Sequence, residues 1–161
     1  MLPVGAQLRG ITGRNDRADL VRVPLAGTNR PTMLYFVTPT CIWCARNERN
    51  FAEIVKQRSD EYHIVFVSLN ESGFSAYVHR NQPLWSDARV TTLTGLSTET
   101  KTDLLLGATP QTMIVGRDGK LLHNWVGAYT RNTLIAVENL FLVQMPGLVQ
   151  QPSGAPDLQG R

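Results

Sequence analysis

The chain has 161 residues, 42% of them hydrophobic and 18% charged, which predicts one domain with a sizeable core. Its two cysteines are too few to form a disulfide scaffold for a domain of this size. No stretch approaches the roughly 18 apolar residues of a membrane span, and no secretory signal is visible at the start of this chain.

The formal net charge of +3 comes entirely from the first 31 residues, where five arginines face two aspartates. These residues are Arg9, Arg14, Arg17, Arg22 and Arg30, against Asp16 and Asp19. No aromatic side chains are interleaved with the arginines, so the pattern favours a solvated face over a nucleic-acid or lipid patch. We therefore expect no nucleic-acid partner.

The chain opens with a predicted β-hairpin. Residues 8–11 and 20–23 are short apolar or alternating runs, and the turn-rich residues 13–16 lie between them. We assign residues 1–31 to an N-terminal hairpin extension. The apolar residues 33–37 then predict a buried strand.

The sequence Cys41-Ile42-Trp43-Cys44 follows this strand and holds the only cysteines of the chain. Helical spacing of apolar residues predicts a helix from Cys41 to about residues 58–60. Both thiols would then lie at a helix N-terminus, where free backbone N–H groups and the helix dipole stabilise a thiolate. Cysteines with this spacing indicate either a redox dithiol or half of a metal site.

The apolar, β-branched residues 64–67 predict a strand buried on both faces, and therefore parallel to its neighbour. Three shorter elements are expected next: a helix at 74–81, a strand at 89–92, and a helix at 97–106 with Ser97 or Thr98 as N-cap and Gly107 as C-cap.

A strand is predicted to start after Pro110 and to return antiparallel at residues 121–126, across the turn at 116–120. Thr130 is the expected N-cap of a last helix, which places Leu134, Val137 and Phe141 on one face. Pro146-Gly147 is expected to end this helix, and residues 146–161 are assigned to a disordered C-terminal tail, of which residues 150–161 are rich in Gly, Pro, Gln and Ser.

This order of elements resembles the thioredoxin fold, and the resemblance covers about residues 33–144. It is closest to the TlpA-like branch of thiol–disulfide oxidoreductases. The N-terminal hairpin, the insertion before the Thr-Pro loop, and the run Gly107-Ala108-Thr109-Pro110 followed by Gly116-Arg117-Asp118-Gly119-Lys120 carry that resemblance. The expected fold is α/β: a central mixed β-sheet flanked by helices, formed by residues 32–145.

The resemblance implies a site with named roles. Cys41, at the helix start, would be the nucleophile, and Cys44, one turn further in, would resolve the mixed disulfide. A cis peptide bond before Pro110 would hold its loop against the cysteines and expose the Thr109 backbone to an extended substrate. Trp43 would either contact a partner or pack on its own loop.

Partners and location also follow from the resemblance. The expected partners are protein disulfides or dithiols and a redox partner, with no cofactor and no metal, and the chain is expected to be a monomer. TlpA-like proteins are mostly exported or membrane-anchored, which favours a periplasmic or otherwise extracytoplasmic location.

The sequence departs from the family where protons are handled. Tyr35 occupies the position of the buried aspartate of many thioredoxins, six residues before the first cysteine. Asn47 occupies that of the TlpA-like glutamate, three residues after the second. Glu48, one residue later, is either a proton relay or part of a solvated helix face.

Three other functions fit the sequence less well. A peroxiredoxin-like peroxide reductase needs Pro-x-x-x-Thr-x-x-Cys, and Pro39-Thr40-Cys41 is too short. A copper-delivery or other metal-binding module of this fold commonly spaces its cysteines by three, and the histidines here lack paired metal spacing. A redox-inert interaction domain is the third alternative.

Overall fold

The computed structural model describes residues 1–70 and 87–150. Its strands are β1 (Gly10–Arg14), β2 (Leu20–Pro24), β3 (Thr32–Val37), β4 (His63–Ser68), β5 (Val90–Leu93), β6 (Gly95–Leu96), β7 (Gln111–Val115) and β8 (Leu121–Val126). Its helices are α1 (Ile42–Arg46), α2 (Glu48–Arg58), α5 (Thr98–Leu104) and α6 (Arg131–Phe141).

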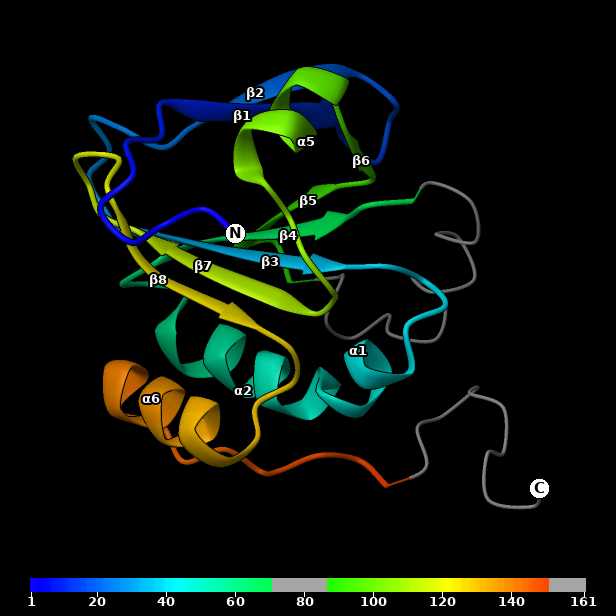
Figure 1. Cartoon of the computed structure of the whole chain (residues 1–161), viewed down its shortest axis with the longest axis vertical. Helices are drawn as coiled ribbons and strands as arrows, with labels where there is room; N and C mark the ends of the chain where they lie inside the picture. Colours follow the sequence, from blue (N-terminus) through cyan, green and yellow to red (C-terminus); the bar gives the residue numbers. More distant parts are fainter. Residues whose placement is uncertain (71–86, 151–161) are drawn as a thin grey trace.

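A mixed five-stranded sheet in the order β5-β4-β3-β7-β8 divides the molecule into two layers (Figure 1). Strands β3, β4 and β5 run parallel, while β7 is antiparallel to β3 and β8 is antiparallel to β7. This is the central mixed sheet expected from the sequence. The parallel pairing of β3 with β4 and the β7–β8 hairpin are confirmed.

Strand β3 lies at the centre of the sheet and has apolar side chains on both faces. Met33, Tyr35 and Val37 belong to the core on the side of α1 and α2, whereas Leu34 and Phe36 belong to the core on the opposite side. Successive side chains of a strand point to opposite faces, so a continuous apolar run can fill two cores at once. This double burial anchors the end of the strand that leads to the cysteines.

Helices α2 and α6 cover one face of the sheet (Figure 1). Helix α2 buries Phe51, Ile54 and Val55, and α6 buries Val137 and Phe141 in the same core. The spacing of three and four residues puts these side chains on one side of each helix. None of the helices in the described residues is long and apolar enough to cross a membrane.

A second, three-stranded sheet in the order β2-β1-β6 lies over the opposite face together with α5 (Figure 1). The predicted N-terminal hairpin is confirmed as β1 and β2. Strand β6 was not predicted, because its two residues are too few to show an alternating pattern. It pairs Gly13 with Leu96 and joins the hairpin to the insertion that precedes the Thr-Pro loop.

Two helix boundaries differ from prediction. The segment from Cys41 to Arg58 is two helices that meet at Asn47, which is at once the C-cap of α1 and the N-cap of α2. Helix α5 starts after Ser97, as predicted, but it ends at Leu104 with the left-handed Leu105 as C-cap, so the assignment of Gly107 was wrong. The helix predicted at 74–81 lies outside the described residues.

Residues 142–150, which we call the C-terminal strap, run from α6 along α2 to α1 (Figure 1). Its Val143 and Met145 are buried in the core beneath the helices. Gly147 N–H donates to the Asn50 side chain at 2.9 Å, and Val149 N–H donates to the carbonyl of Arg46 at 2.9 Å. The strap therefore reaches the helix that carries the cysteines. The predicted divisions of the chain at residues 31 and 145 stay predictions, and residues 151–161 lie outside the described residues.

Gly13, where β1 meets β6, is predicted to leave no room for a side chain. A Cβ atom built on Gly13 would collide with the backbone carbonyl oxygen of Gly95. Gly13→Ala should therefore destabilise the protein by about 1–3 kcal/mol, as other overpacked substitutions do. Chemical denaturation measures this change. Gly107→Ala is the matched control, because its Cβ would meet nothing closer than 3.8 Å. Equal stability of both variants would contradict the β1–β6 contact.

Candidate active site

Cys41 is the N-cap of α1. Its backbone is extended (φ −80°, ψ 112°), and its Sγ accepts a hydrogen bond from Cys44 N–H at 3.0 Å. Sulfur thus takes the place that a serine or aspartate oxygen usually has at a helix start. A thiolate here would receive the same N–H and the positive end of the helix dipole, so the position favours the charged form of Cys41.

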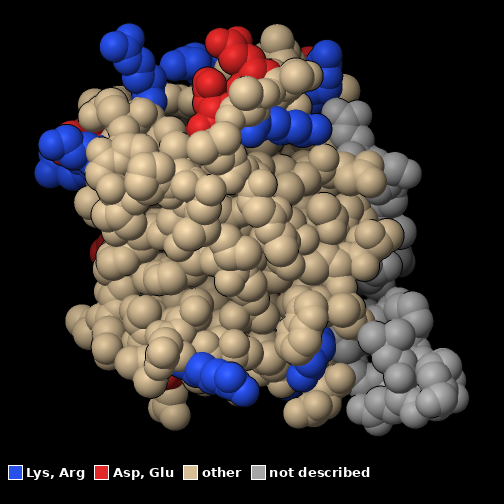
Figure 2. All heavy atoms as spheres, viewed as in Figure 1, with Lys and Arg blue, Asp and Glu red and all other residues tan. Residues whose placement is uncertain are grey.

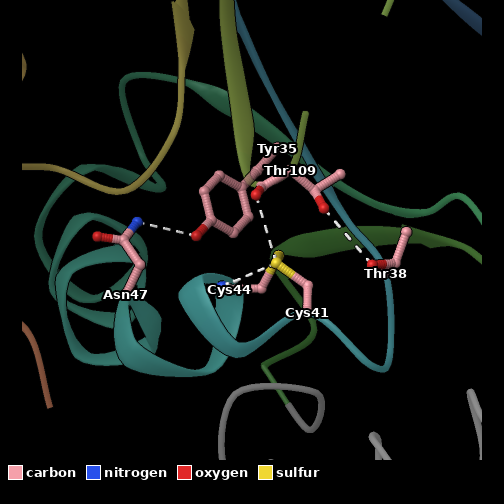
Figure 3. Close-up of a disulfide and its surroundings, with 6 residues drawn as sticks. All are labelled: Tyr35, Thr38, Cys41, Cys44, Asn47 and Thr109. Carbon is pink, nitrogen blue, oxygen red and sulfur yellow. Dashed lines mark hydrogen bonds between the residues drawn. A yellow bond between two sulfur atoms is a disulfide. The ribbon is translucent and has the colours of Figure 1, made fainter. Parts of the chain in front are cut away.

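Cys41 and Cys44 are joined by a disulfide (Figure 3). The two sulfurs differ in access: Cys44 is 1% exposed and belongs to the core, whereas Cys41 is half-buried. Thiol–disulfide exchange requires the attacking and attacked sulfurs to approach in line, so a large partner can reach only the accessible one. The asymmetry between the two cysteines is therefore built into the fold.

The Thr109–Pro110 loop lies against Cys41 (Figure 3). The peptide bond before Pro110 is cis, as predicted, and the Thr109 carbonyl oxygen is 3.3 Å from Cys41 Sγ. The hydroxyls of Thr109 and Thr38 are 3.4 Å apart, which ties the loop to the segment that leads into α1. Segments almost 70 residues apart in sequence thus meet at one sulfur.

Gln111 braces this loop, and sequence reasoning missed it. Its fully buried side chain accepts from Gly107 N–H at 2.9 Å and donates to the Asn124 side chain at 2.8 Å. On the other side, Gly127 N–H donates to the carbonyl of Pro110 at 2.7 Å. A polar residue opening an otherwise apolar strand, directly after Thr-Pro, was the available signal.

A buried polar network lies next to the disulfide and is centred on Asn47. The Asn47 amide donates to the Tyr35 hydroxyl at 2.9 Å (Figure 3). Its carbonyl oxygen accepts from the Asn50 side chain at 2.9 Å and from Tyr129 N–H at 3.0 Å. Asn47 and Asn50 are fully buried, and Tyr35 and Tyr129 are 1% exposed. All four side chains are uncharged, so they form a neutral hydrogen-bonded cluster beside the disulfide.

Tyr129 extends this network to β7, because its hydroxyl and that of Thr112 are 2.8 Å apart. Burial raises the pKa of the Tyr129 hydroxyl well above its usual value, and the Thr112 hydrogen bond lowers it only in part. The hydroxyl therefore stays protonated at any pH at which the protein is normally studied.

Glu48 lies next to Asn47 in sequence. It is the first residue of α2 and stays a predicted proton relay. Asn47 lies beside Tyr35 and Cys44 (Figure 3). The sequence singled out Asn47 and Glu48, but only the tertiary structure shows that the Asn47 side chain bonds to Tyr35.

Trp43, between the cysteines, is 47% exposed. The guanidinium carbon of Arg46 lies 4.5 Å from the centre of its ring, a cation–π contact. Arg46 Nε also donates to the carbonyl of Val149 in the C-terminal strap at 3.0 Å. The indole therefore packs against the Arg46 guanidinium and is still open to solvent. Within the two described ranges, no group of three His, Cys, Asp or Glu side chains could hold a metal ion.

Comparison with known proteins agrees with this geometry. A family model for the thioredoxin-like domain matches residues 20–140. The chain belongs to this family. The match includes β2 and ends within α6, so it spans the cysteines and the Thr109–Pro110 loop. A search of curated proteins finds no match.

Solved structures show the same fold. A candidate thiol:disulfide interchange protein DsbE from Chlorobium tepidum is 16% identical with a TM-score of 0.65, covering 88% of this chain and 96% of its own. The thioredoxin domain of a thiol-disulfide oxidoreductase from Bacteroides vulgatus is 15% identical with a TM-score of 0.62, covering 88% and 99%. StoA from Bacillus subtilis is 15% identical with a TM-score of 0.60, covering 85% and 98%.

Asn47 is predicted to be the costliest polar side chain to remove near the site. Asn47→Ala would take away hydrogen-bond partners from Tyr35, Asn50 and Tyr129 N–H, all in the buried interior. Each buried group left without a partner costs about 1–3 kcal/mol, so we expect a loss of at least about 2 kcal/mol. Urea unfolding of the oxidised protein measures it.

The control for this prediction is Asn132→Ala, at an exposed position of α6. A surface substitution of this kind should change stability by no more than about 0.5 kcal/mol. A similarly small effect at Asn47 would mean that the buried network contributes nothing to folding.

Proposed function

We propose that this protein is a thiol–disulfide oxidoreductase in which Cys41 is the nucleophile and Cys44 the resolving cysteine. One observation carries the proposal: the accessible sulfur is the one that receives the Cys44 N–H at the start of α1. The family match supports the chemistry, and the resemblance to the TlpA-like branch supports protein disulfides as substrates.

The reaction in the reducing direction has two steps. The Cys41 thiolate attacks a partner disulfide, forming a Cys41–partner disulfide and releasing one partner thiolate, which takes a proton from water. Cys44 then loses its proton and attacks Cys41 Sγ, closing the Cys41–Cys44 disulfide and releasing the second partner thiol. Two electrons pass to the partner, and the reverse sequence oxidises a dithiol. The direction depends on the reduction potential of the pair relative to that of its compartment.

Thr109 and Pro110 are proposed to bind the polypeptide around the partner's cysteine. Thr109 is half-buried beside Cys41, and its N–H takes part in no hydrogen bond with the described residues. An extended segment could pair with this backbone as an added strand while its sulfur reaches Cys41. Trp43 would form the apolar wall next to it.

Proton transfer to and from Cys44 is proposed to involve the neutral cluster around Asn47. Tyr35 and Asn47 lie beside the disulfide (Figure 3), and the Asn47 amide donates to the Tyr35 hydroxyl at 2.9 Å. Such groups can orient and hydrogen-bond a thiol without a nearby negative charge. No observation favours the peroxide-reductase, metal-binding or redox-inert alternatives.

Reactivity is the first test. In the reduced protein, Cys41 should be alkylated by iodoacetamide near pH 6 much faster than Cys44, because only Cys41 is both accessible and at the helix start. Mass spectrometry of the digested protein locates the label. Preferential labelling of Cys44 would reverse the two assignments.

The exchange assay is the second test. The native protein should accelerate the reduction of insulin by dithiothreitol, and Cys41→Ser should reduce the acceleration to background. Cys44→Ser keeps the attacking thiol but cannot resolve the intermediate, so it should accumulate dithiothreitol-sensitive adducts with a disulfide-containing protein. Adducts formed by Cys41→Ser but absent from Cys44→Ser would contradict the roles proposed for the two cysteines.

A further inference from the structure

The pair formed by Trp43 and Arg46 places a positive charge at the edge of the redox site. Trp43 lies between the two cysteines, and the Arg46 guanidinium is held 4.5 Å from its ring centre. Trp43 remains 47% exposed, so the pair reaches solvent. A partner whose sulfur is bonded to Cys41 must pass close to Trp43, two residues further along the chain.

Arg46 is held in place from both ends. Its backbone carbonyl accepts from Val149 N–H at 2.9 Å, and its Nε donates to the Val149 carbonyl at 3.0 Å. These reciprocal bonds to the C-terminal strap fix a side chain that would otherwise sample many rotamers. A pre-positioned cation loses less conformational entropy on binding than a free one.

Within residues 1–70 and 87–150, no ion pair neutralises the charge of Arg46. Ion pairs between described residues involve Arg58 and Arg89, and none includes Arg46. Its nearest charged neighbours in sequence are Glu48 and Arg49, of opposite sign. In the face seen in Figure 2, charged side chains gather at the two ends of the view and leave a broad uncharged middle. Arg46 therefore offers a fixed positive charge beside Trp43.

We propose that the Trp43–Arg46 pair selects protein segments that carry an acidic residue close to their reactive cysteine. The indole would pack against the partner's backbone or apolar side chains, and the guanidinium would attract the carboxylate. This inference rests on the proposed thiol–disulfide exchange and specifies its substrates. It makes Arg46 a specificity residue, with no part in breaking or forming the disulfide bond.

The test compares two peptide substrates. Each is a disulfide-linked dimer of a short peptide with one cysteine, and the two peptides differ only in having Glu or Lys two residues after it. The rate constant for oxidation of the reduced protein is measured by acid quenching and chromatography. Charge alters the intrinsic reactivity of a disulfide, so the quantity compared is the Glu/Lys rate ratio of each variant relative to that of the native protein.

We expect the native Glu/Lys ratio to exceed that of Arg46→Gln by about three- to tenfold at low ionic strength, the range for attraction and repulsion at an exposed ion pair. Arg46→Glu should invert the ratio, and Arg46→Lys should keep most of it. The difference should shrink in 0.5 M salt, where the Debye length falls to about 4 Å.

Lys56→Gln, at an exposed position in the last turn of α2, makes the same change in net charge away from the cysteines. It should leave the native ratio unchanged. The proposal is overturned if Arg46→Gln keeps the native ratio, or if Lys56→Gln lowers it as much as Arg46→Gln does. Failure of the native protein to oxidise with either peptide would instead refute the proposed function.

Discussion

The hydrogen bond from Cys44 N–H to Cys41 Sγ is the interaction on which the rest of the site depends. It requires Cys41 to end an extended segment and α1 to begin in the next residue, so the end of β3 must be fixed. Strand β3 is fixed because it is buried on both faces and paired on both sides. The position of one sulfur is therefore set by the whole central sheet.

The second constraint is that the buried residues around Cys44, among those that the structure describes, include no charged side chain. Asn47 stands at the junction of α1 and α2, where two helix ends leave backbone groups without helical partners. Its side chain links β3 through Tyr35, α2 through Asn50 and the segment before α6 through Tyr129. A carboxylate there would carry a desolvation cost that the amide avoids. The site combines a half-buried, accessible Cys41 at the start of α1 with a neutral interior.

The C-terminal strap connects these two layers. Gly147 bonds to Asn50 in the interior network, and Val149 bonds to Arg46 at the surface. The last described residues of the chain thus tie the C-terminal end of α1 and the first turn of α2 together. Gly147 and Val149, which the predicted domain division assigned to the tail, contribute contacts next to the redox cysteines.

Local pattern by itself determined much of this protein. Alternating and apolar runs located β1, β2, β3, β4, β7 and β8, since burial on one or both faces imposes a residue pattern. The CxxC sequence and Thr109-Pro110 identified the redox site, because both depend on residue type and spacing. Tertiary structure alone decided the rest. Strand β6 is stabilised by its pairing with β1. Gln111 can be buried because its amide hydrogen-bonds to Gly107 N–H in the loop before it. The Asn47 side chain reaches the Tyr35 hydroxyl from the junction between α1 and α2. Contacts of this kind join residues that lie apart in the chain, so a local sequence pattern does not predict them.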